Sequence, residues 1–158
     1  MTLKYDSIAW REIRNQKLRE WVQDPYAVDV VLDLSELAEV WDDIVDGDNP
    51  IDKDRVGRLF YRLIAELPFN PFFVQHKARI APVFVTAMNA WQDANKMELG
   101  SDDDDKARAF TLRFWCVEII IYVIHLTRGY EVMRSLSADV RKFFTGHESL
   151  NEYLEALP

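Results

Sequence analysis

The sequence predicts an all-α protein, a single compact bundle of about six or seven helices with a central apolar helix near residues 103–127. Apolar residues recur at steps of three and four along almost the whole chain, the spacing that gathers side chains on one face of a helix. The chain has only 5 glycines and 6 prolines in 158 residues, which favours long elements with few turns. Hydrophobic residues make up 49% and charged residues 29%, as in proteins with a buried core. At this length a single domain over residues 1–158 is expected.

The first predicted helix covers residues 8–22. Its apolar residues have helical spacing, and Ser7 can cap its first turn. Pro25 ends it, because proline disfavours helical geometry in the residue before it. Residues 28–32 are rich in β-branched side chains, but a lone strand would have no partner, so a helical or irregular lead-in is expected there.

The next two helices are predicted from their capping residues. Asp33 and Glu36 have the spacing of a capping box at the start of the second helix. Gly47 can end that helix in the left-handed conformation. The third helix is expected to begin after Asp52 and to carry one apolar stripe over residues 56–67.

Helical sequence also lies on either side of the central helix. The fourth helix is predicted over residues 71–95, with Asn70 as its cap and with Pro82 kinking or splitting it. A helix over residues 130–144 and a short terminal helix complete the chain.

The central helix begins at four aspartates, residues 102–105, each favoured at a helix N-terminus by about 0.3–1 kcal/mol. Its most apolar run, residues 114–126, contains Glu118 and His125. A membrane span needs about 20 apolar residues. We therefore expect this run to be a buried core helix and the protein not to bind a membrane.

Charge and cysteine content exclude several classes of function. The chain has 19 basic and 27 acidic residues and a net charge of −8, which disfavours direct binding to nucleic acid. The one cysteine, Cys116, excludes an intrachain disulfide and a multi-cysteine zinc site, and it is expected in the core. The first residues hold no apolar stretch of signal-peptide length. We expect a cytoplasmic protein without a cofactor.

The end of the second helix is unusually acidic. Asp42, Asp43 and Asp46 fall in its last turns, where the helix dipole opposes carboxylates, and Asp48 follows. Carboxylates at the end of a helix where the dipole disfavours them, with no compensating interaction evident in the sequence, mark a candidate functional site. We predict that these aspartates bind a partner. Packing against an arginine and binding of Ca²⁺ or Mg²⁺ are alternatives, although the loop does not fit the calcium-hand pattern.

Two ionisable residues lie within the apolar central helix. Glu118 and His125 are two turns apart and share one face. Buried ionisable groups need partners, and Arg79, His76 and Arg113 are candidates. We interpret them as an internal polar contact that fixes helix register, with catalysis and metal binding as alternatives.

Aromatic residues are abundant, with 9 Phe, 6 Tyr and 5 Trp. Phe69, Phe72 and Phe73 lie at a predicted helix corner beside two prolines. Aromatic side chains dominate protein–protein hot spots, so this corner is predicted to bind a partner. The alternative is that it folds inward and fills the core.

Two weaker patterns involve charged residues. Glu36 and Glu39 have the spacing of one metal-binding pair of the helical nucleotide pyrophosphatases, but such a spacing is common on solvated helices. The densest group of basic residues is interpreted as a solvated helix face, or as a contact for an acidic partner, and comprises Arg11, Arg14, Lys17 and Arg19.

Four segments resemble small helical proteins encoded by tailed bacteriophages. They are WDDIVDGDNP (41–50), LPFNPFF (67–73), NAWQDAN (89–95) and HESLNEYL (147–154). The resemblance covers roughly residues 34–155, and those proteins have no assigned activity. It implies a phage-encoded product made in a bacterial cytoplasm, either a virion component or a host-directed factor, and it assigns no catalytic residue.

These observations favour a non-enzymatic interaction or assembly module. It would bind a protein partner, which could be a second copy of itself, through the acidic helix end and the aromatic corner. The alternative is a small metal-dependent hydrolase that uses Asp42, Asp43 and Asp46, or Glu118 with His125. A weaker alternative is an acidic decoy for a DNA-binding protein.

Overall fold

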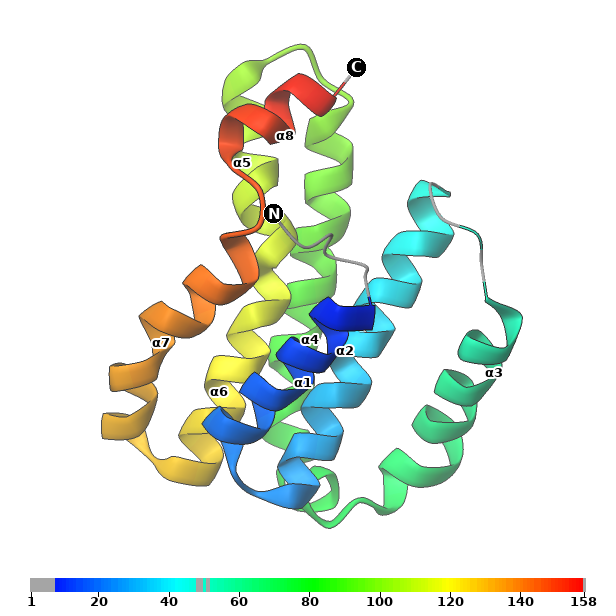
Figure 1. The fold of residues 1–158 in the computed structure, drawn as a ribbon, viewed down its shortest axis with the longest axis vertical. Helices are drawn as coiled ribbons and strands as arrows, with labels where there is room; N and C mark the ends of the chain where they lie inside the picture. The colour runs from blue at the N-terminus through cyan, green and yellow to red at the C-terminus, as the bar shows by residue number, and fades with distance from the viewer. Residues whose placement is uncertain (1–7, 48–49, 51, 158) are drawn as a thin grey trace. The chain divides into compact units, whose positions relative to one another are not determined.

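The structure is a computed structural model that describes residues 8–47, 50 and 52–157. Within these residues it contains helices and no strand (Figure 1), which confirms the predicted all-α class. The α-helices are α1 (Ile8–Val22), α2 (Pro25–Asp46), α3 (Lys53–Tyr61), α4 (Pro71–Glu98), α5 (Asp103–Arg113), α6 (Val117–Arg128), α7 (Tyr130–Thr145) and α8 (Leu150–Ala156). Shorter turns of π- or 3₁₀-helix are η1 (Arg62–Glu66), η2 (Leu67–Phe69) and η3 (Phe114–Cys116).

The chain divides into two compact units, which we describe separately. Among the described residues, the N-terminal unit spans residues 8–77 and the C-terminal unit spans residues 78–157. Helix α4 begins in the first unit and continues into the second. The single domain expected from the length stays a prediction.

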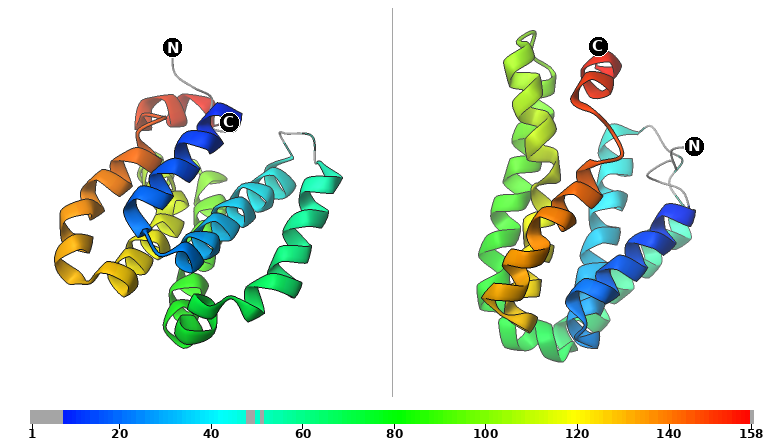
Figure 2. Two further views of the ribbon diagram at one scale, coloured as in Figure 1. Left: turned by 60° about the horizontal axis from the view of Figure 1, so that its bottom comes forward. Right: turned by 60° about the vertical axis from the view of Figure 1, so that its left-hand side comes forward.

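In the N-terminal unit, α1, α2 and α3 follow one another in alternating directions (Figures 1 and 2). Helix α2 begins nine residues earlier than predicted, at Pro25. The Asp24 side chain accepts a hydrogen bond from the Ala27 N–H at 2.8 Å, and Pro25 occupies the first helical position, where its missing N–H costs nothing. The assignment of Asp33 as the cap was therefore wrong, because Asp33 lies in the middle of α2 and is buried.

The end of α2 and the start of α3 follow the predicted signals. Gly47 has φ 66°, a left-handed conformation that suits glycine, and its N–H bonds to the Asp43 carbonyl. Asp52 caps α3 by accepting from the Asp54 and Arg55 N–H groups. Helix α3 then continues through η1 and η2 to Phe69, and we call residues 53–69 the α3 segment.

The C-terminal unit is built from the rest of α4 together with α5 to α8. Asn70 caps α4 as predicted, since its Oδ1 accepts from the Phe73 N–H at 3.0 Å. The helix is not split at Pro82, which lies inside one continuous helical run of 28 residues. After α5 and α6 the chain reverses at Gly129, and α7 packs against α6 while α8 packs against α5.

The predicted central helix is present over residues 103–128, interrupted by the 3₁₀ turn η3. Burial is concentrated in its second half, where α6 has six buried residues: Val117, Ile119, Ile120, Ile121, Val123 and Ile124. Cys116 is exposed rather than in the core, because the 3₁₀ turn places it on the surface. By length and composition alone this segment could also cross a membrane, the one such segment among the described residues, and its most apolar window is 39% buried.

Candidate functional site

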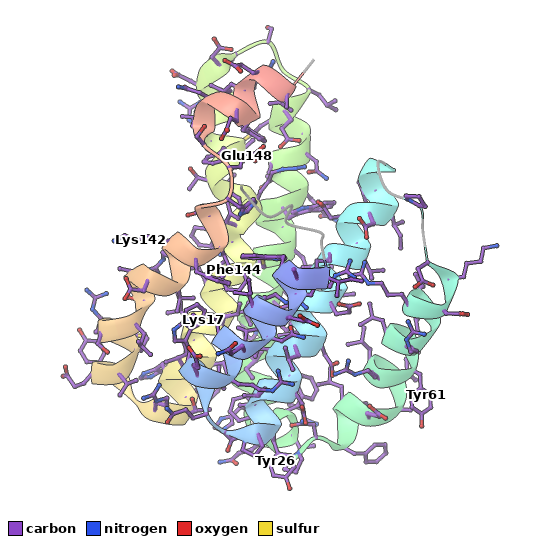
Figure 3. The ribbon with its side chains drawn as sticks, in the orientation of Figure 1. Lys17, Tyr26, Tyr61, Lys142, Phe144 and Glu148 are labelled. Carbon is purple, nitrogen blue, oxygen red and sulfur yellow. The ribbon has the colours of Figure 1, made fainter. Side chains whose placement is uncertain are left out.

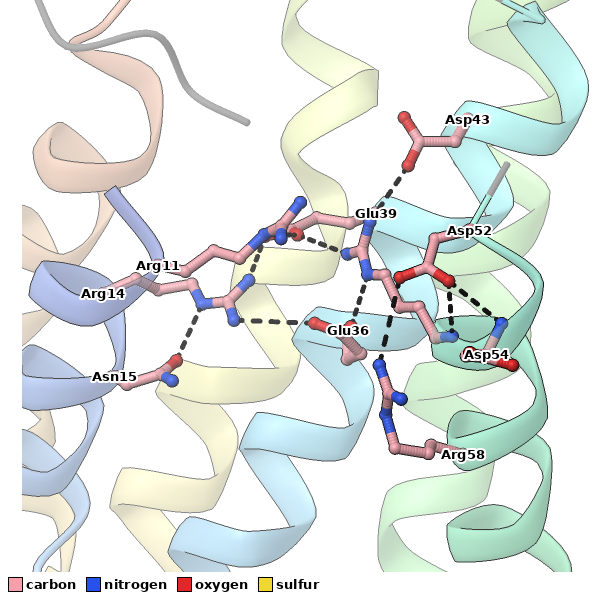
Figure 4. A network of polar contacts seen from close by, with 10 residues as sticks. Arg11, Arg14, Asn15, Glu36, Glu39, Asp43, Asp52, Asp54 and Arg58 are labelled. Carbon is pink, nitrogen blue, oxygen red and sulfur yellow. Dashed lines mark hydrogen bonds and ion pairs between the residues drawn. The ribbon is translucent and has the colours of Figure 1, made fainter. Parts of the chain in front are cut away.

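A network of ion pairs joins the first three helices (Figure 4). Helix α2 contributes Glu36, Glu39 and Asp43, whose spacing places them along one side of the helix. Arginines approach them from both neighbouring helices, and these are Arg11 and Arg14 of α1 and Arg55 of α3. Three positive and three negative groups leave the network formally neutral.

Arg55 binds all three acidic side chains of the network. Its Nε donates to Glu36 Oε1 at 2.5 Å, its Nη2 to Glu39 Oε2 at 2.7 Å and its Nη1 to Asp43 Oδ2 at 3.1 Å. Each nitrogen of the guanidinium therefore has its own carboxylate. Because the Arg55 side chain is only 13% exposed, water screens these contacts weakly.

Helix α1 supplies the other two arginines. Arg14 Nη1 donates to Glu39 Oε1, and its Nε donates to Asn15 Oδ1 at 3.1 Å. Arg11 Nε donates to Glu39 Oε2 at 3.1 Å. Glu39 thus joins α1 to α3 through its two oxygens, and Arg14 is buried although it is charged.

The environment shifts the titration of both glutamates. Burial acts to raise the pKa of Glu36, but the Arg55 hydrogen bond and the nearby arginine charges outweigh burial and lower it. Burial raises the pKa of the more enclosed Glu39, against the charges of Arg14, Arg11 and Arg55. Both carboxylates are occupied by guanidinium groups, so the network holds helices together and offers no open coordination position.

This geometry bears on the metal-binding alternatives. Asp42 follows Glu39 by three residues, so a second acidic spacing, Glu-x-x-Asp, adjoins the Glu-x-x-Glu of Glu36 and Glu39. In the structure the two glutamates bind arginines instead. Within the described residues, no group of three or more His, Cys, Asp or Glu side chains is arranged to hold a metal ion.

The structure describes part of the acidic end of α2, and for Asp46 and Asp48 partner binding stays a prediction. Asp43 belongs to the ion network, so for this residue the structure shows the arginine-packing alternative. Asp42 is half-buried. The side chain of Asp46 and the whole of Asp48 lie outside the described part of the chain.

A second ion pair lies between α2 and η1. Arg62 Nη2 is 2.5 Å from Oδ1 of the buried Asp33. Burial raises the pKa of Asp33, and the Arg62 charge opposes this shift. Together, Arg55, Leu59 and Arg62 form what we call the inner face of the α3 segment, with buried Leu59 between the two arginines.

Glu118 and His125, the two ionisable residues of the central helix, have different neighbours and do not form one site. Glu118 accepts two hydrogen bonds of 2.7 Å from Arg141 of α7, a fork that fixes α6 against α7 and raises the pKa of Arg141. Half-buried His125 lies beside Tyr122, with ring centroids 6.0 Å apart. Arg79 lies 6.0 Å over the same Tyr122 ring.

The predicted aromatic corner is divided between the core and the surface. Phe72 is buried and contacts the His76 ring, with centroids 4.7 Å apart, so Phe72 acts as the core plug of the alternative interpretation. Phe73 is half-buried. Phe69 is 80% exposed, so it alone of the three phenylalanines presents most of its side chain to solvent.

Sequence reasoning missed three large apolar side chains of the α3 segment that are exposed. Phe60 is 55% exposed, Tyr61 62% and Ile64 70%. Figure 3 shows Tyr61 on the side of α3 turned away from α2. We call Phe60, Tyr61, Ile64 and Phe69 the outer face of the α3 segment.

The residues of the apolar stripe follow two lines along the segment. Leu59 and Phe60 are consecutive in α3 and lie about 100° apart around the helix, and the π turn continues the two lines that they begin. The Leu67 N–H bonds to the Arg62 carbonyl, five residues back, which widens the helix to about 4.4 residues per turn. Residues four apart then stay close to one line. Leu59, Leu63 and Leu67 follow the inner side, whereas Phe60, Ile64 and Pro68 follow the outer side, where all three are exposed.

A polar cluster in the C-terminal unit anchors α8. Glu98 of α4 accepts from Arg113 Nε at 2.8 Å and from the Tyr153 hydroxyl. Burial and the Glu98 contact raise the pKa of Tyr153. Half-buried His147 lies beside Phe114, with ring centroids 5.7 Å apart. The cluster joins three helices and is structural in the same way as the ion network.

His147 gives this unit a pH-dependent stability. Burial lowers the pKa of His147, against a hydrogen bond to the Phe144 backbone, so the folded chain favours the neutral imidazole. The stabilisation that comes from keeping His147 neutral is complete above the pKa of about 6.5 that histidine has in the unfolded chain. It is lost as the pH falls through the lower pKa that His147 has in the folded chain. Between pH 7 and pH 5, the free energy of unfolding should fall less for His147→Gln than for the wild type, as measured by urea denaturation. An unchanged loss would contradict this role.

Comparisons with protein-family models, with curated proteins and with solved structures gave no match.

Proposed function

We propose that this protein is a non-enzymatic protein-binding module whose contact surface is the outer face of the α3 segment. One observation carries the proposal: the α3 segment exposes a group of large apolar side chains on the part of its surface that is not packed against α2. Leu59 faces inward and is buried, while Phe60 and Ile64 are exposed. Exposed patches of apolar and aromatic side chains are typical of binding sites.

The inner face supports this proposal by holding the segment in place. Arg55 ties the beginning of the segment to α2, and Arg62 ties its middle to Asp33. These contacts leave the opposite side free for a partner. A binding surface on a fixed helix loses less conformational entropy on association than one on a mobile loop.

The other functions considered from the sequence receive less support. Arg55 binds Asp43, so this residue of the acidic end of α2 is already engaged within the chain. A hydrolase built on Asp42, Asp43 and Asp46, or on Glu118 with His125, would need carboxylates that arginines bind, since Asp43 pairs with Arg55 and Glu118 with Arg141. The nucleotide pyrophosphatase pattern loses Glu36 and Glu39 in the same way. A cytoplasmic phage product, as the sequence resemblance implies, stays a prediction.

Site-specific photo-crosslinking tests the proposal. The photoreactive analogue p-benzoylphenylalanine replaces Phe60 in the full-length protein, and cells that produce it are irradiated. We expect a covalent adduct with a protein, detected as a mass increase. The matched control replaces Leu99, which is 86% exposed in the other unit, and should give no such adduct. Absence of an adduct at position 60, or equal adducts at both positions, would contradict the proposal.

A further inference from the structure

We propose that the partner of the outer face is the same face of a second copy of this chain, with the two α3 segments antiparallel about a two-fold axis. The inference rests on the proposed function and names its partner. Three features of the segment support a second copy: the area of the face, its charge and the order of its side chains.

The area of the outer face matches what a stable dimer requires. Three of the four residues of the outer face are aromatic, and an aromatic side chain offers about 150–250 Å². Together with Ile64, the exposed parts of these side chains amount to roughly 500 Å² of apolar surface. A stable interface buries about 800 Å² on each partner, of which about 60% is apolar. The face therefore supplies the apolar part of such an interface.

The charge of the segment allows two copies to approach. The whole chain carries −8, which makes most orientations of two copies repulsive. In the α3 segment, Arg55 and Arg62 are neutralised by carboxylates of α2. The remaining charges are two basic residues, Lys53 and Arg58, and two acidic residues, Asp54 and Glu66. The segment presents no net charge beyond these pairs.

The positions of two of these charges favour the antiparallel orientation. Arg58 and Glu66 are eight residues apart, about two turns when the π turn is included, so they lie on the same flank of the outer face. A two-fold axis between residues 62 and 63 brings Arg58 of one copy level with Leu67 of the other, one residue from Glu66, twice. Within its own chain, Arg58 has a 70% exposed side chain, and its ion pair with Asp52 is long, at 3.9 Å.

The same axis sets two large side chains opposite small residues and one large side chain opposite another. Phe60 lies at the level of Ala65 in the second copy, whereas Tyr61 lies at the level of Ile64, which is also large. Gly57 lies at the level of Pro68, and space around Gly57 is open, since an added Cβ would meet no atom within 4 Å. Alternation of large and small residues across an interface lets the two surfaces interdigitate.

Sedimentation velocity on the purified full-length protein tests the dimer. We expect a dimer that dissociates on dilution, and we expect Ile64→Lys to shift it to monomer at the same concentration. The control Leu99→Lys, at a still more exposed apolar residue in the other unit, should leave the dimer unchanged. Circular dichroism verifies that both variants keep their helix content. A wild-type monomer throughout, or a dimer that Ile64→Lys does not weaken, would overturn the proposal.

A charge exchange tests the antiparallel register. Arg58→Glu places like charges beside Glu66 of the second copy and should weaken the dimer about tenfold or more, while the double variant Arg58→Glu with Glu66→Arg should restore it. Failure of the double variant to restore it would contradict this register.

Irradiation of the purified protein with the photoreactive residue at position 60 separates this proposal from the broader one. An adduct of twice the chain mass supports a second copy. An adduct formed only in cells, with a protein of different mass, overturns the second copy and leaves the proposed function standing. No adduct under either condition overturns both.

Discussion

Replacing Arg55 with alanine is expected to lower the free energy of unfolding by about 3 kcal/mol or more. The change leaves three carboxylates of α2 facing only Arg11 and Arg14, so a neutral network becomes one with a net charge of −1 in a poorly solvated place. Removing one partner of a buried ion pair is costly because the remaining charge has lost both water and its counter-charge. Urea denaturation of the purified variant measures the loss.

The same helix provides the control for this prediction. Arg58→Ala removes an arginine whose side chain is 70% exposed and whose ion pair within the chain is 3.9 Å long, so a loss of no more than about 0.5 kcal/mol is expected when both variants are unfolded at a dilution that keeps the protein monomeric. Arg55→Lys keeps the charge but cannot direct three nitrogens at three carboxylates, and its stability should fall between those of the wild type and Arg55→Ala. Equal losses for Arg55→Ala and Arg58→Ala would show that the network does not hold α3.

The second large effect is expected in α6. Ile124 is fully buried, so Ile124→Ala removes buried methyl groups and leaves a cavity, at a cost of about 3–5 kcal/mol. The matched substitution Ile8→Ala, at a residue 75% exposed at the start of α1, should change stability by no more than about 0.5 kcal/mol. Thermal or urea unfolding distinguishes them, and a small loss for Ile124→Ala would contradict the placement of α6 in the core.

Much of the fold could be predicted from the sequence because its helix ends depend on local chemistry. Gly47, Asp52 and Asn70 act where the sequence placed them, since capping needs only neighbouring residues. The start of α2 was missed because Asp33 and Glu36 have the spacing of a capping box, whereas both bind arginines of the α3 segment. The same three-residue spacing suits both a capping box and two ion pairs with a neighbouring helix, so the spacing alone does not show which of these forms.

The site was less predictable, because its parts come together only in three dimensions. Arg11 and Arg14 were recognised as one pattern and Glu36 with Glu39 as another, but nothing in either spacing joins α1 to α2. Arg55, which completes the network, belongs to neither pattern.

The outer face, apart from Phe69, escaped prediction for a related reason. Residues 56–67 have the spacing of one apolar stripe, and the sequence alone assigns Leu59, Phe60 and Ile64 to a single buried face. Leu59 and Phe60 are consecutive in α3 and lie about 100° apart around the helix, and only Leu59 is buried. Which of two neighbouring apolar residues is covered depends on how α3 packs, and periodicity does not reveal this.

Hydroxyl-radical footprinting of Phe60 and Tyr61 tests most directly the claim that the outer face is covered by a protein. Oxidation of these two side chains is compared between dilute purified protein and the same protein in the cells that produce it, with Leu99 as the internal reference. We predict rapid oxidation of both aromatic residues in the dilute sample and strong protection in cells, while Leu99 changes little. Equal oxidation in the two samples, relative to Leu99, would contradict the claim.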